Sequence, residues 1–254
     1  MKNSRRYQKR KKREKRRKRI LNLLLLLFII ALIYLFVFKT DFFNIKNIEI
    51  KGNKNLSDDQ ILKASICMNG ENIFKINNKY CEENINKLAY VKSVKIIRKL
   101  PSTIKIQIVE REEIAIIPYI GAFVYIDEEG YVLRMEERKG DTELPQVFGL
   151  ELINLQIGDC IFDSVEGSGN LDFFTLGKEA KLLEQMKYIN FSDKKNTMIE
   201  LNNGIKVAFG PLDNVKYKLS FLSKILKDIE EKKLVVKQIL MNKGENPIIV
   251  MDDI

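Results

Sequence analysis

The longest apolar stretch of the chain lies near the N-terminus, where residues 20–38 are hydrophobic apart from one Asn and one Tyr. As an α-helix this stretch is roughly 28 Å long, which is close to the hydrocarbon thickness of a bilayer. A cleaved signal sequence has a shorter apolar region that ends in a small-residue cleavage site, whereas residues 39–43 are Lys, Thr, Asp, Phe and Phe. A core helix of a soluble domain would carry a polar face. The pattern therefore predicts an uncleaved transmembrane helix over residues 20–38.

The next seventy residues show short patterns in the order strand, helix, helix, strand, strand. Ile48 and Ile50 alternate with polar neighbours, as in a half-buried strand. Ser57 and Gln60 have the spacing of a capping box, which predicts the start of a helix. Pro101 fixes its own φ and disfavours a helical residue before it, so it predicts a turn between strands. The predicted elements are a strand over residues 47–51, a helix from residue 57 that ends at residues 69–70, a helix over residues 78–88, and strands over residues 91–99 and 103–111.

Residues 112–254 are mostly strand-like and carry two helical patterns. Gly130 can adopt positive φ and predicts a hairpin between residues 122–127 and 131–135. Residues 139–142 and 163–172 are rich in turn formers and are expected to form surface loops. Helices are predicted over residues 175–188 and 213–230, the second capped by Asp213 and buried through Val215, Leu219, Leu222, Leu226 and Ile229. Further strands are predicted over residues 197–201, 205–209, 235–241 and 247–251.

Charge separates the N-terminal tail from the rest of the chain. Residues 2–19 hold thirteen Lys and Arg against the single acid Glu14, whereas the whole chain has a formal net charge of +10. Basic residues beside a span stay on the cytoplasmic side, so residues 1–19 are predicted to be cytoplasmic and the large C-terminal part extracytoplasmic. The tail can rest on anionic lipid. Because the remainder is slightly acidic, we expect no specific nucleic-acid surface on it.

The composition argues against most catalytic chemistry. The chain has no His, which excludes Ser/His and Cys/His nucleophile pairs and imidazole metal ligands. The P-loop and GxSxG motifs are also absent from the sequence. Acidic clusters at residues 127–129 and 252–253 are typical of solvated turns, although two carboxylates can support glycoside hydrolysis. We therefore expect no enzymatic activity, no cofactor, no metal site and no small-molecule substrate, with a membrane-anchored wall hydrolase as the alternative.

The three cysteines, Cys67, Cys81 and Cys160, do not have zinc-site spacing. An odd number leaves at least one thiol free or paired between chains. Cys67 and Cys81 can pair with each other, but the favoured interpretation is that all three are small buried hydrophobic residues.

Several strings carry a resemblance to a known family. They are FFNIKNIEIKGNKNLS at residues 42–57, VKSVKIIRKLPSTIKIQIVERE at residues 91–112 and IAIIPYIGAFVYIDEEGYVL at residues 114–133. A strand-helix-helix-strand-strand unit directly after a single span resembles a POTRA domain, and these strings resemble the FtsQ/DivIB family of cell-division proteins. The resemblance implies an α+β protein with a transmembrane helix, a POTRA domain over residues 42–111 and a mostly antiparallel, strand-rich β domain with two helices over residues 112–254.

The resemblance also implies a role as a bitopic scaffold at the division septum in the cell membrane. Members bind small coiled-coil membrane proteins of the FtsB/DivIC and FtsL type near their C-terminal strand and help to control septal peptidoglycan synthesis. A POTRA-type translocation accessory is a further alternative, but that class usually has repeated POTRA units or an outer-membrane barrel.

The C-terminal segment, residues 235–251, is the best candidate for partner binding. It is rich in apolar β-formers at a chain end, and a sheet edge can accept a strand from a partner. The same residues can also simply complete the core sheet. The predicted partner-binding residues are Ile239, Met241, Lys243, Gly244, Ile249 and Val250.

Overall fold

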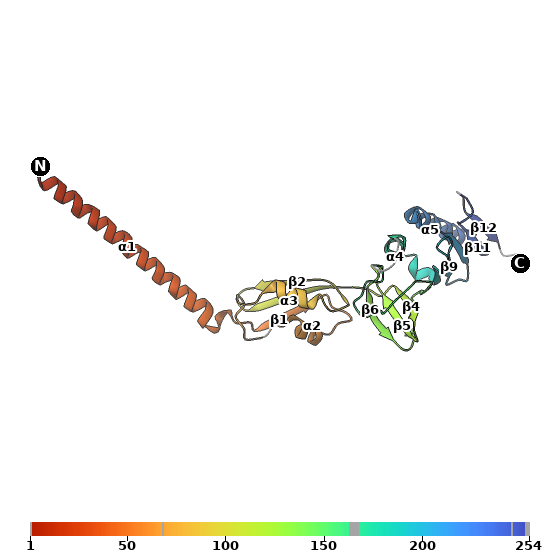
Figure 1. Ribbon diagram of the computed structural model, residues 1–254, viewed down its shortest axis with the longest axis horizontal. Coiled ribbons are helices and arrows are strands. Elements are labelled where there is room, and N and C mark those ends of the chain that lie inside the picture. Colours follow the sequence, from red (N-terminus) through yellow and green to blue (C-terminus); the bar gives the residue numbers. More distant parts are fainter. Residues whose placement is uncertain (1, 68, 163–167, 245, 252–254) are drawn as a thin grey trace. The chain divides into compact units, whose positions relative to one another are not determined.

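The computed structural model describes residues 2–67, 69–162, 168–244 and 246–251 (Figure 1). The chain divides into two compact units, Met1–Ile85 with Val94–Ile108 and Asn86–Ser93 with Val109–Ile254. The POTRA-like sequence therefore contributes most of the first unit, and the strand-rich half forms the second.

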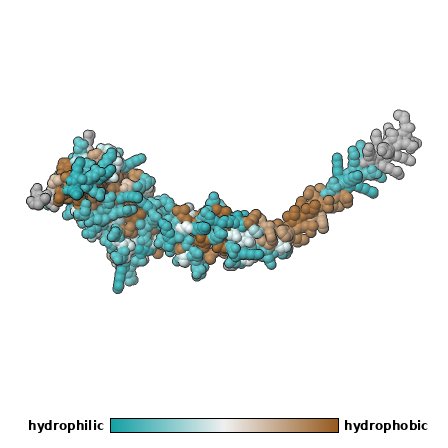
Figure 2. All heavy atoms as spheres, turned by 180° about the vertical axis from the view of Figure 1, so that it is seen from behind, coloured by the Kyte–Doolittle hydropathy of each residue, from teal (hydrophilic) through white to brown (hydrophobic). Residues whose placement is uncertain are grey.

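The N-terminal segment is one continuous helix, α1 (Lys2–Lys39). It extends beyond the predicted span because Lys and Arg are good helix formers and allow the helix to include the basic tail. Its part Lys12–Lys39 is long and apolar enough to cross a membrane, and none of the apolar window is buried by other residues. Figure 2 shows the apolar run as a brown stretch next to the teal basic tail. The helix fits a single-pass membrane protein.

The first unit after the span has the predicted β-α-α-β-β order. A short 3₁₀ helix, η1 (Asp41–Phe43), leads into β1 (Asn47–Lys51), α2 (Asp58–Ser65) and α3 (Asn78–Ile85), followed by β2 (Val91–Lys99) and β3 (Thr103–Glu110). The sheet order is β1-β3-β2, and β1 runs parallel to β3 with Asn47 opposite Thr103. Ile61, Ile85, Ile104 and Ile106 are fully buried between helices and sheet.

Local signals fixed the start of α2 but not its end. Ser57 accepts a hydrogen bond from the Gln60 backbone N–H, and the Gln60 side chain accepts one from the Ser57 N–H, so the predicted capping box is confirmed. The helix ends at Ser65 rather than at residues 69–70, because Ile66 adopts left-handed backbone angles. Helix α3 likewise ends three residues before the predicted residue 88.

The second unit is built on a nine-stranded sheet in the order β12-β11-β10-β9-β8-β7-β4-β5-β6. Neighbouring strands pair antiparallel except at β4·β7, β7·β8 and β10·β11. Helices α4 (Ser168–Glu179) and α5 (Val215–Lys232) add Phe173, Phe174, Leu219 and Leu222 to the core. The strands are β4 (Ala115–Tyr119), β5 (Ala122–Ile126), β6 (Val132–Glu136), β7 (Gln146–Phe148), β8 (Met186–Asn190), β9 (Thr197–Leu201), β10 (Lys206–Gly210), β11 (Val236–Leu240) and β12 (Ile248–Met251).

The predicted helix over residues 175–188 was wrong in both boundaries. Residues 168–172, expected to be loop, form the first turns of α4, while residues 163–167 lie outside the described part of the chain. The helix ends at Glu179, and Lys181 has a φ of 55°. Tyr188 lies in β8, which pairs with β7 on one side and β9 on the other. Pairing with distant strands overrode the local helical pattern there.

Helix α5 was found within two residues of its predicted bounds, but its details differ. The residue before it is Asn214, in left-handed conformation and without a side-chain capping bond, so Asp213 is not the cap. The carboxylate of Asp213 instead pairs with Lys218. Leu226 packs against the core but is only partly buried, and Ile225, which was not predicted, is buried beside it.

The cysteines are free, and they do not share one environment. Cys67 and Cys81 are buried in the first unit, where the Cys67 thiol donates to the Cys81 sulfur over 3.1 Å. Cys160 is only partly buried, contrary to the expectation for all three, and its thiol donates to the Glu129 carbonyl over 3.4 Å.

Candidate protein-binding edge

Strand β12 is the last strand at one end of the nine-stranded sheet. It pairs antiparallel with β11, with Ile249 opposite Ile239 and Ile248 opposite Leu240. Among the described residues, no strand pairs with its other side. An edge strand of this kind presents a row of unpaired backbone N–H and C=O groups.

All four side chains of β12 are exposed and apolar. Their exposed fractions are 47% for Ile248, 38% for Ile249, 36% for Val250 and 47% for Met251. Because side chains alternate between the two faces of a strand, neither face of β12 is covered. The strand therefore combines open backbone with apolar surface on both sides.

The structure divides the predicted partner-binding residues into two groups. Ile239 is fully buried and Met241 is 8% exposed, so both side chains belong to the core. Lys243 and Gly244 are exposed in the turn before β12, where Gly244 has a φ of 94°. Together with Ile249 and Val250, they are the accessible members of the set. Partner binding by any of the six residues stays a prediction.

A groove of about 290 Å³ lies between the turn before β12 and the start of α5. Tyr217 is 61% exposed, and its ring stacks on Phe221 with centroids 5.8 Å apart. The sequence analysis missed this groove, although aromatic residues four positions apart on a helix indicate a shared flank. Its lining includes Pro211, Tyr217, Lys218, Phe221, Met241 and Pro247.

The side chain of Lys218, which lines this groove, is bound by other residues of the groove. The Lys218 Nζ donates to the Pro211 carbonyl over 2.7 Å and pairs with Asp213. It also lies 5.6 Å from the centroid of the buried Phe209 ring. The groove therefore offers an apolar, aromatic wall beside the exposed edge strand.

Comparison with known proteins identifies the family. The model of the FtsQ-type POTRA domain matches residues 43–111, and the model of the FtsQ/DivIB C-terminal domain matches residues 115–240. The cell division protein DivIB of Clostridium botulinum strain Hall is 31% identical over 225 residues, which is 84% of each chain. The chain belongs to the FtsQ/DivIB family of cell-division proteins.

Other members of the FtsQ/DivIB family are similar over most of their length. DivIB of Clostridium tetani is 30% identical, covering 76% of this chain and 74% of that one. FtsQ of Corynebacterium glutamicum is 26% identical, covering 72% and 78%. The solved extracytoplasmic domain of DivIB from Geobacillus stearothermophilus, in its trans isomer, is 17% identical to this chain. The match covers 48% of this chain and 96% of that one, with a TM-score of 0.32. Strand β12 lies beyond the family match, which ends at residue 240.

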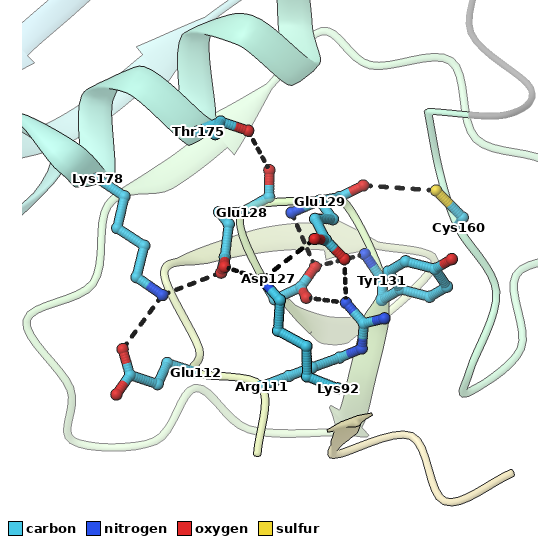
Figure 3. Close-up of polar contacts among 10 residues, drawn as sticks. All are labelled: Lys92, Arg111, Glu112, Asp127, Glu128, Glu129, Tyr131, Cys160, Thr175 and Lys178. Atoms are coloured by element: carbon cyan, nitrogen blue, oxygen red, sulfur yellow. Dashed lines mark hydrogen bonds and ion pairs between the residues drawn. The ribbon is translucent and has the colours of Figure 1, made fainter. Parts of the chain in front are cut away.

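This FtsQ/DivIB family member also contains a partly buried cluster of charged residues in its second unit (Figure 3). The Asp127 carboxylate is fully buried and accepts hydrogen bonds from Arg111 over 2.5 Å and from the backbone N–H of Glu129 and Tyr131. The side chain of Arg111 is 11% exposed and also pairs with Glu129 over 2.6 Å. The expectation that residues 127–129 are solvated was therefore wrong for Asp127, because its turn folds over the end of β3.

Glu128 is held on two sides in the same cluster. Lys92 donates to it over 2.8 Å and Lys178 over 3.0 Å. Burial acts to raise the pKa of Glu128, but the hydrogen bonds from these two lysines outweigh it and lower the pKa to about 2. Burial raises the pKa of Asp127, against the opposing effect of Arg111.

The cluster has the properties of a structural element rather than of a catalytic pair. Asp127, Glu128 and Glu129 each accept hydrogen bonds from Lys or Arg side chains, so their charges are already neutralised. In the described residues there is no group of three metal-ligating side chains. Arg111 and Asp127 therefore serve to fasten the β5–β6 turn to the residues that follow β3.

Proposed function

We propose that this chain is a non-catalytic, bitopic scaffold of the division machinery at the septum. Its N-terminus would lie in the cytoplasm and residues 42–254 outside the membrane. The support for this orientation is the set of thirteen basic residues, against the single acid Glu14, in front of the span. The support for a division role is membership of the FtsQ/DivIB family.

The partner would add a strand to β12. Strand addition satisfies the open N–H and C=O groups of an edge, and side-chain pockets add specificity. The observation that carries this proposal is the exposure of all four apolar residues of β12, Ile248, Ile249, Val250 and Met251. Small coiled-coil membrane proteins of the FtsB/DivIC and FtsL type are the proposed partners, with the partner strand on β12 and further contacts in the aromatic groove at Tyr217.

The proposed mechanism is physical tethering. Two proteins anchored in one bilayer meet at a high effective concentration, so that a weak contact between their exported parts is sufficient for assembly. The assembled complex would then control septal peptidoglycan synthesis. Neither step requires a reactive side chain on this chain.

The test replaces exposed residues of β12 in the full-length chain. Ile249→Asp and Val250→Asp place a charge on the docking surface, so capture of membrane division partners from solubilised membranes should fall by about tenfold or more. Met241 and Ile239 are unsuitable positions, because a charge in the core would unfold the domain. Ile153→Asp is the matched control, since Ile153 is 82% exposed in the same unit but lies outside the sheet.

Circular dichroism should show the same fold for all three variants. If Ile249→Asp and Val250→Asp capture partners as well as Ile153→Asp does, the partner surface is not β12.

A further inference from the structure

The residues that follow the span form an aromatic cluster with the end of the span itself. Phe36 lies in the apolar run, two residues before its end. Its ring is 5.5 Å from that of Phe42 and 5.9 Å from that of Phe43, centroid to centroid. The rings of Phe42 and Phe43 therefore lie beside the last turn of the span.

A loop of the first domain joins this cluster from far along the sequence. The ring of Phe74, in the connection between α2 and α3, is 5.2 Å from that of Phe43. The backbone fixes this contact, since the Ile73 N–H donates to the Phe43 carbonyl over 2.9 Å and the Ile45 N–H donates to the Glu71 carbonyl over 2.8 Å.

Asn72 ties the same loop to the end of α1. Its side-chain amide donates to the Val37 carbonyl over 2.6 Å, and its side-chain oxygen accepts from the Phe74 N–H over 3.0 Å. The last carbonyls of a helix have no partner within the helix, so Asn72 satisfies one of them. Asn72 is 5% exposed, which makes it a specific link rather than a surface polar residue.

The cluster remains partly uncovered by protein. Phe42 is 51% exposed and Phe74 is 40% exposed. Large aromatic side chains left in water forgo the free energy of burial, about 25 cal/mol for each Å², whereas the lipid–water interface accepts apolar rings beside a span. Because the span is continuous with these residues, the bilayer is the occupant that reaches them.

We propose that Phe42, Phe43 and Phe74 form an interfacial anchor that seats the α2–α3 loop of the first domain in the lipid–water interface at the C-terminal end of the span. The anchor would limit the rotation of the domain about the end of α1. The charges around the anchor nearly cancel, since Asp41 and Glu71 offset two of the three lysines Lys39, Lys46 and Lys75. Burial of apolar surface therefore drives the contact with lipid, and a neutral bilayer is sufficient for it.

The absence of Trp from the sequence allows a direct test. Single-Trp variants of the full-length chain, Phe42→Trp and Phe74→Trp, are reconstituted in vesicles of phosphatidylcholine with brominated acyl chains, which quench fluorescence on contact. Gln107→Trp is the control, because Gln107 is exposed and pairs with Lys51, at the end of β1 away from the span. Four strand residues separate Gln107 by about 13 Å from Thr103, which pairs with Asn47 at the end of β1 nearer the span.

Phe74→Trp should be quenched and blue-shifted to the same extent as Phe42→Trp, while Gln107→Trp should remain unquenched and accessible to acrylamide in water. Circular dichroism checks that each variant keeps its fold. The proposal is overturned if Phe74→Trp behaves like Gln107→Trp, or if all three positions are quenched alike. Neither outcome depends on partner binding at β12.

Discussion

Replacing Arg111 with Met should strongly destabilise the β5–β6 hairpin. The change leaves the fully buried Asp127 carboxylate with only two backbone N–H donors, from Glu129 and Tyr131. Two unit charges about 4 Å apart interact by about 4 kcal/mol at an effective dielectric constant of 20. The guanidinium also lies 3.7 Å from the centroid of the Tyr131 ring, which adds about 0.5–1 kcal/mol. Since Met retains part of the packing, we expect a loss of about 3–5 kcal/mol.

Hydrogen exchange of the full-length chain in detergent measures this loss locally, through the opening free energies of the β5 and β6 amides. Lys99→Met is the matched control, because Lys99 pairs with Glu49 over 2.7 Å while both side chains are more than 40% exposed. Its effect on the opening of the β1 and β2 amides should be much smaller than the effect of Arg111→Met on β5 and β6, because an exposed ion pair contributes little to stability. Adding Asp127→Asn to Arg111→Met removes the unpaired charge and should recover part of the stability. Equal costs for the two single variants, or no recovery in the double variant, would refute the role of the buried charge.

The pKa of Glu128 is about 2 in the folded chain against an ordinary 4.5, so its ionised form stabilises the fold above about pH 4.5, and this contribution is lost as the pH falls toward 2. Glu128→Gln should therefore flatten that part of the acid-unfolding curve followed by circular dichroism, and an unchanged curve would contradict the assignment. Burial, followed by the hydrogen bond with Cys67, raises the pKa of Cys81 to about 12, so the Cys81 thiol should resist alkylation in the native state. Refolding with a glutathione redox pair should instead form a disulfide between Cys67 and Cys81 and stabilise the first domain by about 3 kcal/mol. Mass spectrometry detects the disulfide, and the melting temperature measures its effect. Free thiols after refolding would contradict this prediction.

Features of this protein that depend on near neighbours can be predicted from the order of its residues. The span follows from an uninterrupted apolar run, the start of α2 from the spacing of Ser57 and Gln60, and the β5–β6 hairpin from Gly130, whose φ is 84°. Each of these signals acts within a few residues, so no knowledge of distant contacts is required. Family resemblance then supplied the order of the domains.

Contacts between distant residues decided what the sequence left open. Strand β7 escaped prediction because it has only three residues and pairs parallel with β8, about forty residues further along the chain. Part of β8 was predicted as the end of a helix, and its pairing with β7 and β9 overrode that local pattern. In the sequence, Asp127 and Glu128 have the pattern of a solvated turn. In the folded chain Arg111 pairs with Asp127, and Lys92 and Lys178 pair with Glu128.

The candidate edge shows the same division most simply. Ile239 and Ile249 are the same residue type in adjacent, similarly apolar strands, and they face each other across one pair of strands. Ile239 is fully buried, while Ile249 is 38% exposed. The apolar pattern predicts that both residues lie in strands. It does not predict that β11 lies inside the sheet and β12 at its end, because the strand order is set by pairings between strands far apart in the sequence.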